Sequence, residues 1–168
     1  VRQMGEMGLF GLPFPEEFGG MGGDYFALCL AIEEVGKVDQ SVAITLEAGC
    51  SLGAMPVFRF GTEAQKQRWL PHIAQGDPLC AIAITEPDYG SDVASLNLRG
   101  TATSGGWLLD GAKTCRTFAG KAGVLMVVTR TDPDRSLGYK GLKPLLLVGN
   151  QSLQRIVAHE IPPMPSVP

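Results

Sequence analysis

The stretch that organises the chain is Ala83-Ile84-Thr85-Glu86-Pro87-Asp88-Tyr89-Gly90-Ser91-Asp92. A short uncharged run, Leu79–Ile84, leads into it and predicts a buried strand. Hydroxyl and carboxylate side chains follow at once, together with a proline that fixes one φ angle and a glycine that permits an unusual one. Such a turn at the end of a strand can direct several N–H and O–H groups at one polar ligand. A plain chain reversal built from Asx and Ser turns is the alternative that this stretch alone leaves open.

Composition narrows the class of protein. The chain has 168 residues, 45% of them hydrophobic, which suffices for one large or two small domains with a buried core. Its formal net charge is -3 without a basic stripe, so nucleic acid is not an expected partner. Neither the two histidines nor the cysteines have the spacing of metal ligands, so no metal site is expected. The cysteines, expected to be reduced and buried, are Cys29, Cys50, Cys80 and Cys115.

No segment has the pattern of a signal peptide or a membrane span. Arg2 and Glu6 interrupt the opening residues, so no signal peptide is visible there. The longest nearly uncharged stretch, 41–58, contains a glutamate, a glycine and a proline, whereas a spanning helix needs about 20 uninterrupted apolar residues. We therefore expect a helix buried in protein here.

The first part of the chain, 1–77, is predicted to be all-helical. Its opening residues have the pattern of a helix end, and 11–23 is a glycine-rich loop. The loop could cradle a phosphate, but without a preceding strand or a Gly-Lys-Ser/Thr motif a plain connection is favoured. Asp24 is predicted to cap a helix that ends near Val35. Its expected buried face consists of Tyr25, Leu28, Ile32 and Val35.

Two further helical regions follow. Residues 40–60 are apolar on several sides, which predicts an interior helix with a break near 53–56. Thr62 and Gln65 form a capping box that opens the next helix. That helix is expected to be interrupted by Pro71 and stopped by the glycine at 76, so that 76–78 is the domain boundary.

From residue 78 to 168 the pattern changes to short strands between turns. Strands are predicted at 79–84, 107–109, 123–129 and 145–148, with one more possible at 151–157 and an extended proline-rich end at 161–168. The whole is thus an α+β, multi-domain fold. A helical domain, 1–77, precedes a truncated antiparallel β-barrel or sandwich domain, 78–168.

Several motifs in order resemble one family. Thr-Glu-Pro-x-x-Gly-Ser-Asp at 85–92 resembles the flavin-loop signature of the acyl-CoA dehydrogenases, and Gly111–Lys113 with Thr117 resembles their second flavin contact. The likeness extends over about residues 5 to 148. The other matching segments are Glu16–Gly23, Glu33-Glu34, Phe60–Lys66, Leu70-Pro71 and Gly76-Asp77.

This resemblance implies the fold of that family's N-terminal helical domain, without its first helix, and of part of its middle β domain. It implies FAD as cofactor and α,β-dehydrogenation of an acyl-CoA thioester, a reaction of fatty acid metabolism. In the family the carboxylate base comes from a C-terminal helical bundle, and no residue here resembles it. Glu86 and Asp92 are interpreted as stabilising their turn. We therefore expect no catalytic residue in this chain, and expect this piece alone to be inactive.

The resemblance also implies roles for individual residues. Thr85 contacts the pyrimidine end of the flavin, Thr117 faces N5, and Ser91 lies toward the cofactor phosphates and the acyl-thioester end of the substrate. Cys115 stands where the family usually has an aromatic residue that stacks on the flavin, and Arg116 and Phe118 also depart from the pattern. The complete set of predicted cofactor-binding residues is Ile82, Ile84, Thr85, Gly90, Ser91, Cys115 and Thr117, with Ser91 also binding substrate.

These departures leave alternatives open. One is an acyl-CoA oxidase or flavin monooxygenase on the same scaffold, and another is a non-catalytic truncated homologue that acts as a binding or assembly subunit. For the dehydrogenase, the implied partners are an acyl-CoA, an acceptor like electron-transfer flavoprotein and further copies of the full-length chain. The implied location is the bacterial cytoplasm or the mitochondrial matrix.

Overall fold

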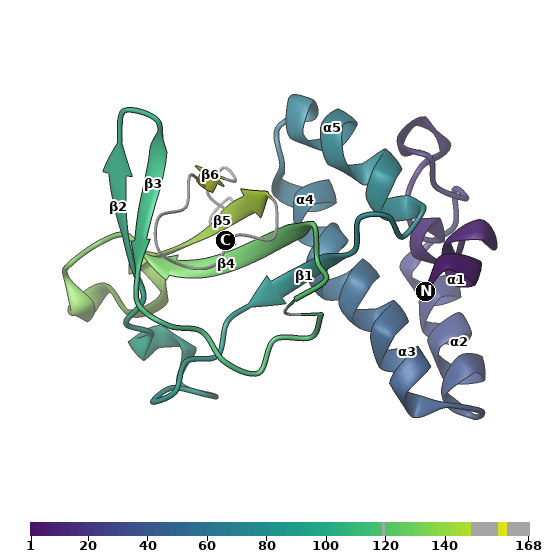
Figure 1. The fold of residues 1–168 in the computed structure, drawn as a ribbon, viewed down its shortest axis with the longest axis horizontal. Helices are drawn as coiled ribbons and strands as arrows, with labels where there is room; N and C mark the ends of the chain where they lie inside the picture. The colour runs from purple at the N-terminus through teal and green to yellow at the C-terminus, as the bar shows by residue number, and fades with distance from the viewer. Residues whose placement is uncertain (119, 149–157, 161–168) are drawn as a thin grey trace. The chain divides into compact units, whose positions relative to one another are not determined.

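The computed structural model describes residues 1–118 and 120–148, and the backbone of 158–160. The chain divides into two compact units, Val1–Ala81 and a second that begins at Ile82. Figure 1 shows helices in the first unit and strands in the second. This confirms the expected order of a helical part followed by a β part. The strand considered at 151–157 and the extended end at 161–168 lie outside the described residues.

The helical unit is built around fully buried side chains such as Phe10, Phe14, Leu28, Leu46 and Leu70. Burial of each such side chain stabilises the unit by about 1.5–3 kcal/mol. Its elements are α1 Arg2–Glu6, the 3-10 turns η1 Leu9–Gly11 and η2 Glu16–Phe18, α2 Tyr25–Gly36, α3 Gln40–Glu47, the π-helical stretch η3 Ala48–Ala54, α4 Met55–Phe60 and α5 Glu63–Ala74.

Both predicted helix caps are present. The Asp24 carboxylate accepts from the Ala27 amide at 2.8 Å and begins α2. Thr62 and Gln65 form a reciprocal capping box at the start of α5. The predicted interruption at Pro71 is wrong, because α5 continues to Ala74. A proline removes one donor from the helix. Burial of Leu70, Ile73 and Ala74 on either side holds that turn in place.

The apolar region 40–60 is helical throughout. The predicted break near 53–56 is instead a π-helical stretch that starts earlier, at Ala48, and leads directly into α4. By length and composition alone, this 21-residue helical segment could cross a membrane. Leu46, Cys50, Ala54 and Val57 are nevertheless fully buried within the helical unit. That burial favours the predicted core helix.

Two expectations about burial are wrong. On α2, Leu28 is buried as predicted, but Tyr25 is 45% exposed, because this helix lies at the surface of its unit. Among the cysteines, Cys50 and Cys80 are buried, whereas Cys29 and Cys115 are exposed. Burial raises the pKa of the Cys50 and Cys80 thiols to about 12.

The β unit contains one six-stranded sheet in the order β1-β4-β2-β3-β6-β5, with β4 also paired to β5. The β2–β3 hairpin is antiparallel, and so is the β4–β5 pair, which runs from Val124 opposite Val148 to Arg130 opposite Leu142 (Figure 1). The sheet is not closed into a barrel. Among the described residues, the β2–β4 and β3–β6 pairings each have one residue pair. The strands are β1 Cys80–Ala83, β2 Arg99–Thr103, β3 Gly106–Asp110, β4 Val124–Arg130, β5 Leu142–Val148 and β6 Ala158–Glu160.

One face of this sheet forms the core of the β unit. Ala83, Leu98, Val127, Leu145 and Leu147 are each at most 3% exposed and pack together. The cluster joins the end of β1 to β4 and β5, and it therefore fixes the point at which the Thr85 turn begins.

Candidate functional site

The predicted signature forms a tight turn directly after β1. The Glu86 amide donates to the Tyr89 carbonyl at 3.0 Å, and the Tyr89 amide donates back to the Glu86 carbonyl at 3.2 Å. Thr85 is half-buried at the start of the turn, and Ser91 is exposed at its end. The turn therefore presents hydroxyl groups on a rigid backbone.

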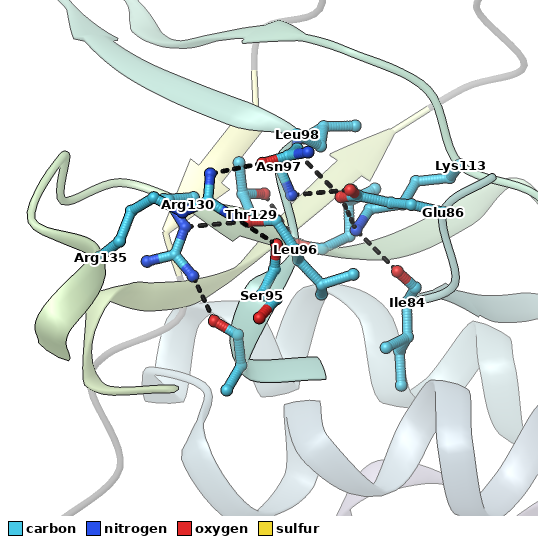
Figure 2. A network of polar contacts seen from close by, with 12 residues as sticks. Ile84, Glu86, Ser95, Leu96, Asn97, Leu98, Lys113, Thr129, Arg130 and Arg135 are labelled. Atoms are coloured by element: carbon cyan, nitrogen blue, oxygen red, sulfur yellow. Dashed lines mark hydrogen bonds and ion pairs between the residues drawn. The ribbon is translucent and has the colours of Figure 1, made fainter. Parts of the chain in front are cut away.

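Glu86 anchors this turn to the chain that follows. Its side chain is buried, with one carboxylate oxygen accepting from the Asn97 amide at 2.7 Å. The other oxygen accepts from the Leu98 amide and the Lys113 ammonium, both at 2.8 Å (Figure 2). These three donors fasten the turn to residues 97, 98 and 113. Asp92 is exposed, and its side chain makes no hydrogen bond to another described residue.

Lys113 joins the turn to the second predicted segment. Its Nζ donates to the Ile84 carbonyl at 2.7 Å as well as to Glu86, and the two charged side chains are only 2% and 4% exposed. The Thr114 amide donates to the Thr85 carbonyl at 2.9 Å. Three bonds among five residues thus place the Thr85 turn beside the loop that contains Thr117.

The electrostatics of the pair favour an ionised carboxylate. Burial alone would raise the pKa of Glu86, but the hydrogen bonds from Lys113 and from two amides outweigh it, so its pKa lies below the ordinary value. Burial lowers the pKa of Lys113, while Glu86 opposes that shift. Removing either partner would leave a buried charge without its counter-charge.

A pH dependence of stability follows from Glu86. The folded state lowers the pKa of Glu86 below its ordinary value of 4.5, so the unfolded state binds more protons as the pH falls past 4.5. The contribution of Glu86 is therefore complete above pH 4.5 and is lost as the pH falls through the lowered native pKa. We expect Glu86→Gln to lack this component. Urea unfolding of both proteins from neutral to acidic pH measures the free energy of unfolding at each pH. If the two curves of free energy against pH were parallel, Glu86 would not be the source of this pH dependence.

The loop from Gly111 onward has an unusual backbone. Cys115 and Phe118 adopt positive φ angles of 52° and 63°, which side chains other than glycine rarely do. Each costs about 1–3 kcal/mol of local strain. Gly111 has a φ of 137°, and a Cβ there would lie 2.9 Å from the Leu98 Cα. Strain of this kind is typical of loops shaped to meet a ligand.

The structure brings together some of the predicted residues. Ile84 and Thr85 lie against the loop through the Lys113 and Thr114 bonds, whereas no hydrogen bond between described residues joins Gly90 or Ser91 to that loop. The hydroxyls of Thr85, Ser91 and Thr117 make no hydrogen bond within the described part of the chain. Ile82, Ile84 and Thr85 are half-buried, and Gly90, Ser91, Cys115 and Thr117 are exposed.

Sequence reasoning missed the residues that support the turn from the other side. Arg130 donates through Nε to the Leu96 carbonyl at 2.9 Å and through Nη2 to the Ala94 carbonyl at 2.5 Å. Arg135 donates to the Asn97 side-chain oxygen at 2.6 Å. Each bond joins residues more than thirty positions apart in the sequence, so no local sequence pattern predicts it. No cluster of metal ligands occurs among the residues that the structure describes.

Comparison with known proteins gives a consistent result along the chain. The N-terminal domain of acyl-CoA dehydrogenases matches residues 1–77, and the middle domain of the same enzymes matches residues 81–163. An acyl-CoA dehydrogenase of Bacillus subtilis is 37% identical over 150 residues, which is 89% of this chain and 39% of that protein. The chain thus spans about two fifths of the length of this curated relative.

Solved structures agree with the sequence comparison. Butyryl-CoA dehydrogenase from Megasphaera elsdenii matches with a TM-score of 0.81 and 37% identity, over 88% of this chain and 39% of that one. An acyl-CoA dehydrogenase from Bacillus anthracis, solved in complex with FAD, matches with a TM-score of 0.77 and 30% identity, over 88% of this chain and 25% of that one. The chain therefore belongs to the acyl-CoA dehydrogenase family and carries its N-terminal and middle-domain sequences.

Proposed function

We propose that this chain forms the flavin-contacting part of an FAD-dependent enzyme that dehydrogenates an acyl-CoA thioester between its α and β carbons. The observation that carries the proposal is the joining of the Thr85 turn to the Gly111–Thr117 loop by a buried ion pair and a backbone bond. Both segments resemble flavin contacts of the family, and the proposal requires them to lie side by side.

The residues present fit such a cofactor. Three hydroxyls, those of Thr85, Ser91 and Thr117, make no hydrogen bond to another described residue, so they are free to bond a polar ring edge or a phosphate. The half-buried side chains of Ile82 and Ile84 offer apolar surface next to Thr85. When bound, FAD supplies the hydride acceptor. In the proposal, Thr85 holds the pyrimidine end, Thr117 donates toward N5, and Gly90 and Ser91 face the phosphates.

The chain's own acidic groups at this site do not supply a base. Glu86 is engaged by Lys113 and two amides, and its pKa lies below the ordinary value. A general base has to reach the proton that it abstracts. We therefore assign no proton transfer to Glu86, and in the proposal this chain contributes binding and orientation only.

We extend the proposal to the electron acceptor and the setting of the enzyme. As a dehydrogenase, the reduced enzyme passes electrons to a flavoprotein carrier in the bacterial cytoplasm or the mitochondrial matrix, and it acts as an oligomer. Stopped-flow measurement of the rates at which a flavoprotein carrier and dissolved oxygen oxidise the reduced enzyme distinguishes a dehydrogenase from an oxidase. Faster oxidation by oxygen would overturn this part alone.

The enzyme class itself is tested with the purified full-length holoprotein, because in the proposal this chain alone supplies no base. We expect a visible flavin spectrum that bleaches when an acyl-CoA is added without oxygen, and no bleaching with the corresponding free acid. A protein that contains no flavin as purified and takes up none on reconstitution would contradict the proposal.

Cys115 provides a gain-of-function prediction. In the family its position usually holds an aromatic residue, and a ring stacked on the flavin contributes about 0.5–1.5 kcal/mol beyond buried area. We expect Cys115→Trp to tighten FAD binding by about tenfold, the upper end of that range. Equilibrium dialysis measures the dissociation constant, with Cys115→Ser as the control for loss of the thiol. Unchanged or weaker binding in Cys115→Trp would contradict the placement of this residue against the ring.

A further inference from the structure

We propose that the β unit carries a second ligand site, which binds an oxyanion of the phosphate class. A cavity of about 710 Å³ lies where β2 begins and β4 ends. None of the residues assigned above to FAD lines it. Its polar and aromatic walls include Arg99, Trp107, Arg130, Asp132 and Arg135.

The charges around the cavity are unbalanced. Three guanidinium groups face a single carboxylate, that of Asp132, which already accepts from the Asp134 amide at 2.9 Å. None of the three arginines forms an ion pair with a described carboxylate. Arg99 and Arg130 are also direct partners across the β2–β4 pairing. Like charges opposite each other destabilise a sheet. An anion between them would remove that repulsion.

Arg130 has one buried side-chain nitrogen without a hydrogen-bond partner among the described residues. Only 6% of this residue is exposed, and two of its nitrogens donate to backbone carbonyls (Figure 2). The third, Nη1, is buried and has no partner among the described residues. A buried donor without a partner is costly, and a charged one more so. Because Nη1 has no accessible surface in this side-chain position, a ligand oxygen would satisfy it only after the guanidinium turns toward the cavity.

The other two arginines suit the same ligand in different ways. The Arg135 guanidinium donates to the Asn97 side-chain oxygen at 2.6 Å and to the Ser95 carbonyl at 2.9 Å. These bonds fix its orientation without a ligand, which lowers the entropy lost on binding. Arg99 is exposed and makes no hydrogen bond to another described side chain. It is therefore available to close on an anion, and its removal should leave the fold intact.

The chemistry favours phosphate, either free or as an ester. Arginine forks match phosphate oxygens in pairs. Trp107 adds an aromatic surface to the same cavity, and Lys143 brings a further cation to 5.5 Å from the centre of that ring. A flat base attached to the phosphate could stack there, so both inorganic pyrophosphate and a nucleoside diphosphate carry the chemistry that the site recognises.

Titration calorimetry on the 168-residue chain at low, constant ionic strength tests the site. Pyrophosphate and ADP are expected to bind, and adenosine is not. Arg99→Gln should weaken pyrophosphate binding by about tenfold, through loss of one charge-assisted pair. The matched control is Lys140→Gln, which removes one positive charge from the same unit outside the cavity wall. It should weaken binding by less than about twofold, because Lys140 is exposed and does not line the cavity, so solvent and salt screen its charge from the ligand.

The outcomes separate the two sources of phosphate and the two sites. ADP binding about tenfold tighter than pyrophosphate identifies a nucleotide ligand, whereas equal affinities identify free phosphate or pyrophosphate. Ser91→Ala should leave both affinities unchanged, since Ser91, which is assigned above to the FAD phosphates, does not line the cavity. The proposal is overturned if pyrophosphate does not bind, if adenosine binds as tightly as ADP, or if Lys140→Gln weakens binding as much as Arg99→Gln.

Discussion

Replacing Glu86 by leucine is expected to lower the free energy of unfolding by about 3–5 kcal/mol, the range for breaking a buried ion pair. The change leaves the Lys113 ammonium buried without a counter-charge and the Asn97 and Leu98 amides without an acceptor. Lys113→Met should cost less, because Glu86 keeps both amide donors. Urea unfolding followed by circular dichroism at neutral pH measures both values.

An ion pair on the surface supplies the control. Lys37 and Glu34 approach to 2.6 Å, closer than Lys113 and Glu86, but their side chains are 57% and 71% exposed. Exposed pairs contribute at most about 1 kcal/mol. Glu34→Leu should therefore change the free energy of unfolding by less than that. If Glu86→Leu cost no more than Glu34→Leu, the pair would not be holding the two segments together.

The second large effect concerns the cofactor. Thr85→Val and Thr117→Val each remove a hydroxyl that makes no hydrogen bond to another described residue, while keeping the shape of the side chain. Each lost hydrogen bond to FAD is worth about 0.5–1.5 kcal/mol, so each variant should bind FAD up to about tenfold more weakly. The loss of FAD affinity in the double variant should approach the product of the two single losses. Dissociation constants from flavin fluorescence titrations measure these changes.

Thr101→Val is the matched control for these variants. Thr101 is exposed on β2, and its hydroxyl makes no hydrogen bond to another described residue. We expect this substitution to leave FAD affinity unchanged. If the wild type and the Thr85→Val, Thr117→Val double variant bound FAD with equal affinity, the two hydroxyls would not contact the cofactor, and the proposed cofactor site would be wrong.

Much of the fold follows from local rules in the sequence. Asp24 and the Thr62–Gln65 pair mark helix starts because their side chains satisfy free amides nearby in the chain. The run at 123–129 is found as β4 because its residues are buried on both faces. By contrast, β2, Arg99–Thr103, was not predicted, since only Gly100 in it is buried and no alternation of apolar residues appears. Its pairing with β3 places it in the sheet.

The ion pair that holds the candidate site together could not be predicted from local sequence rules. The sequence shows Glu86 as a turn residue and Lys113 as a motif residue, 27 positions apart. Only the folded chain brings their charges to 2.8 Å and buries both. The exposure of Cys29 and Cys115 was likewise missed, because neighbouring apolar residues do not show which side of a helix or loop faces the core.

In the proposal, the Thr85 turn and the Gly111–Thr117 loop form one surface that contacts one flavin. The most direct measurement is an NMR titration of the ¹⁵N-labelled chain with FAD. We predict that amide signals from residues 85–92 and from residues 111–117 shift together, with one common saturation curve. Shifts confined to one of the two segments, or two curves with different dissociation constants, would contradict the claim.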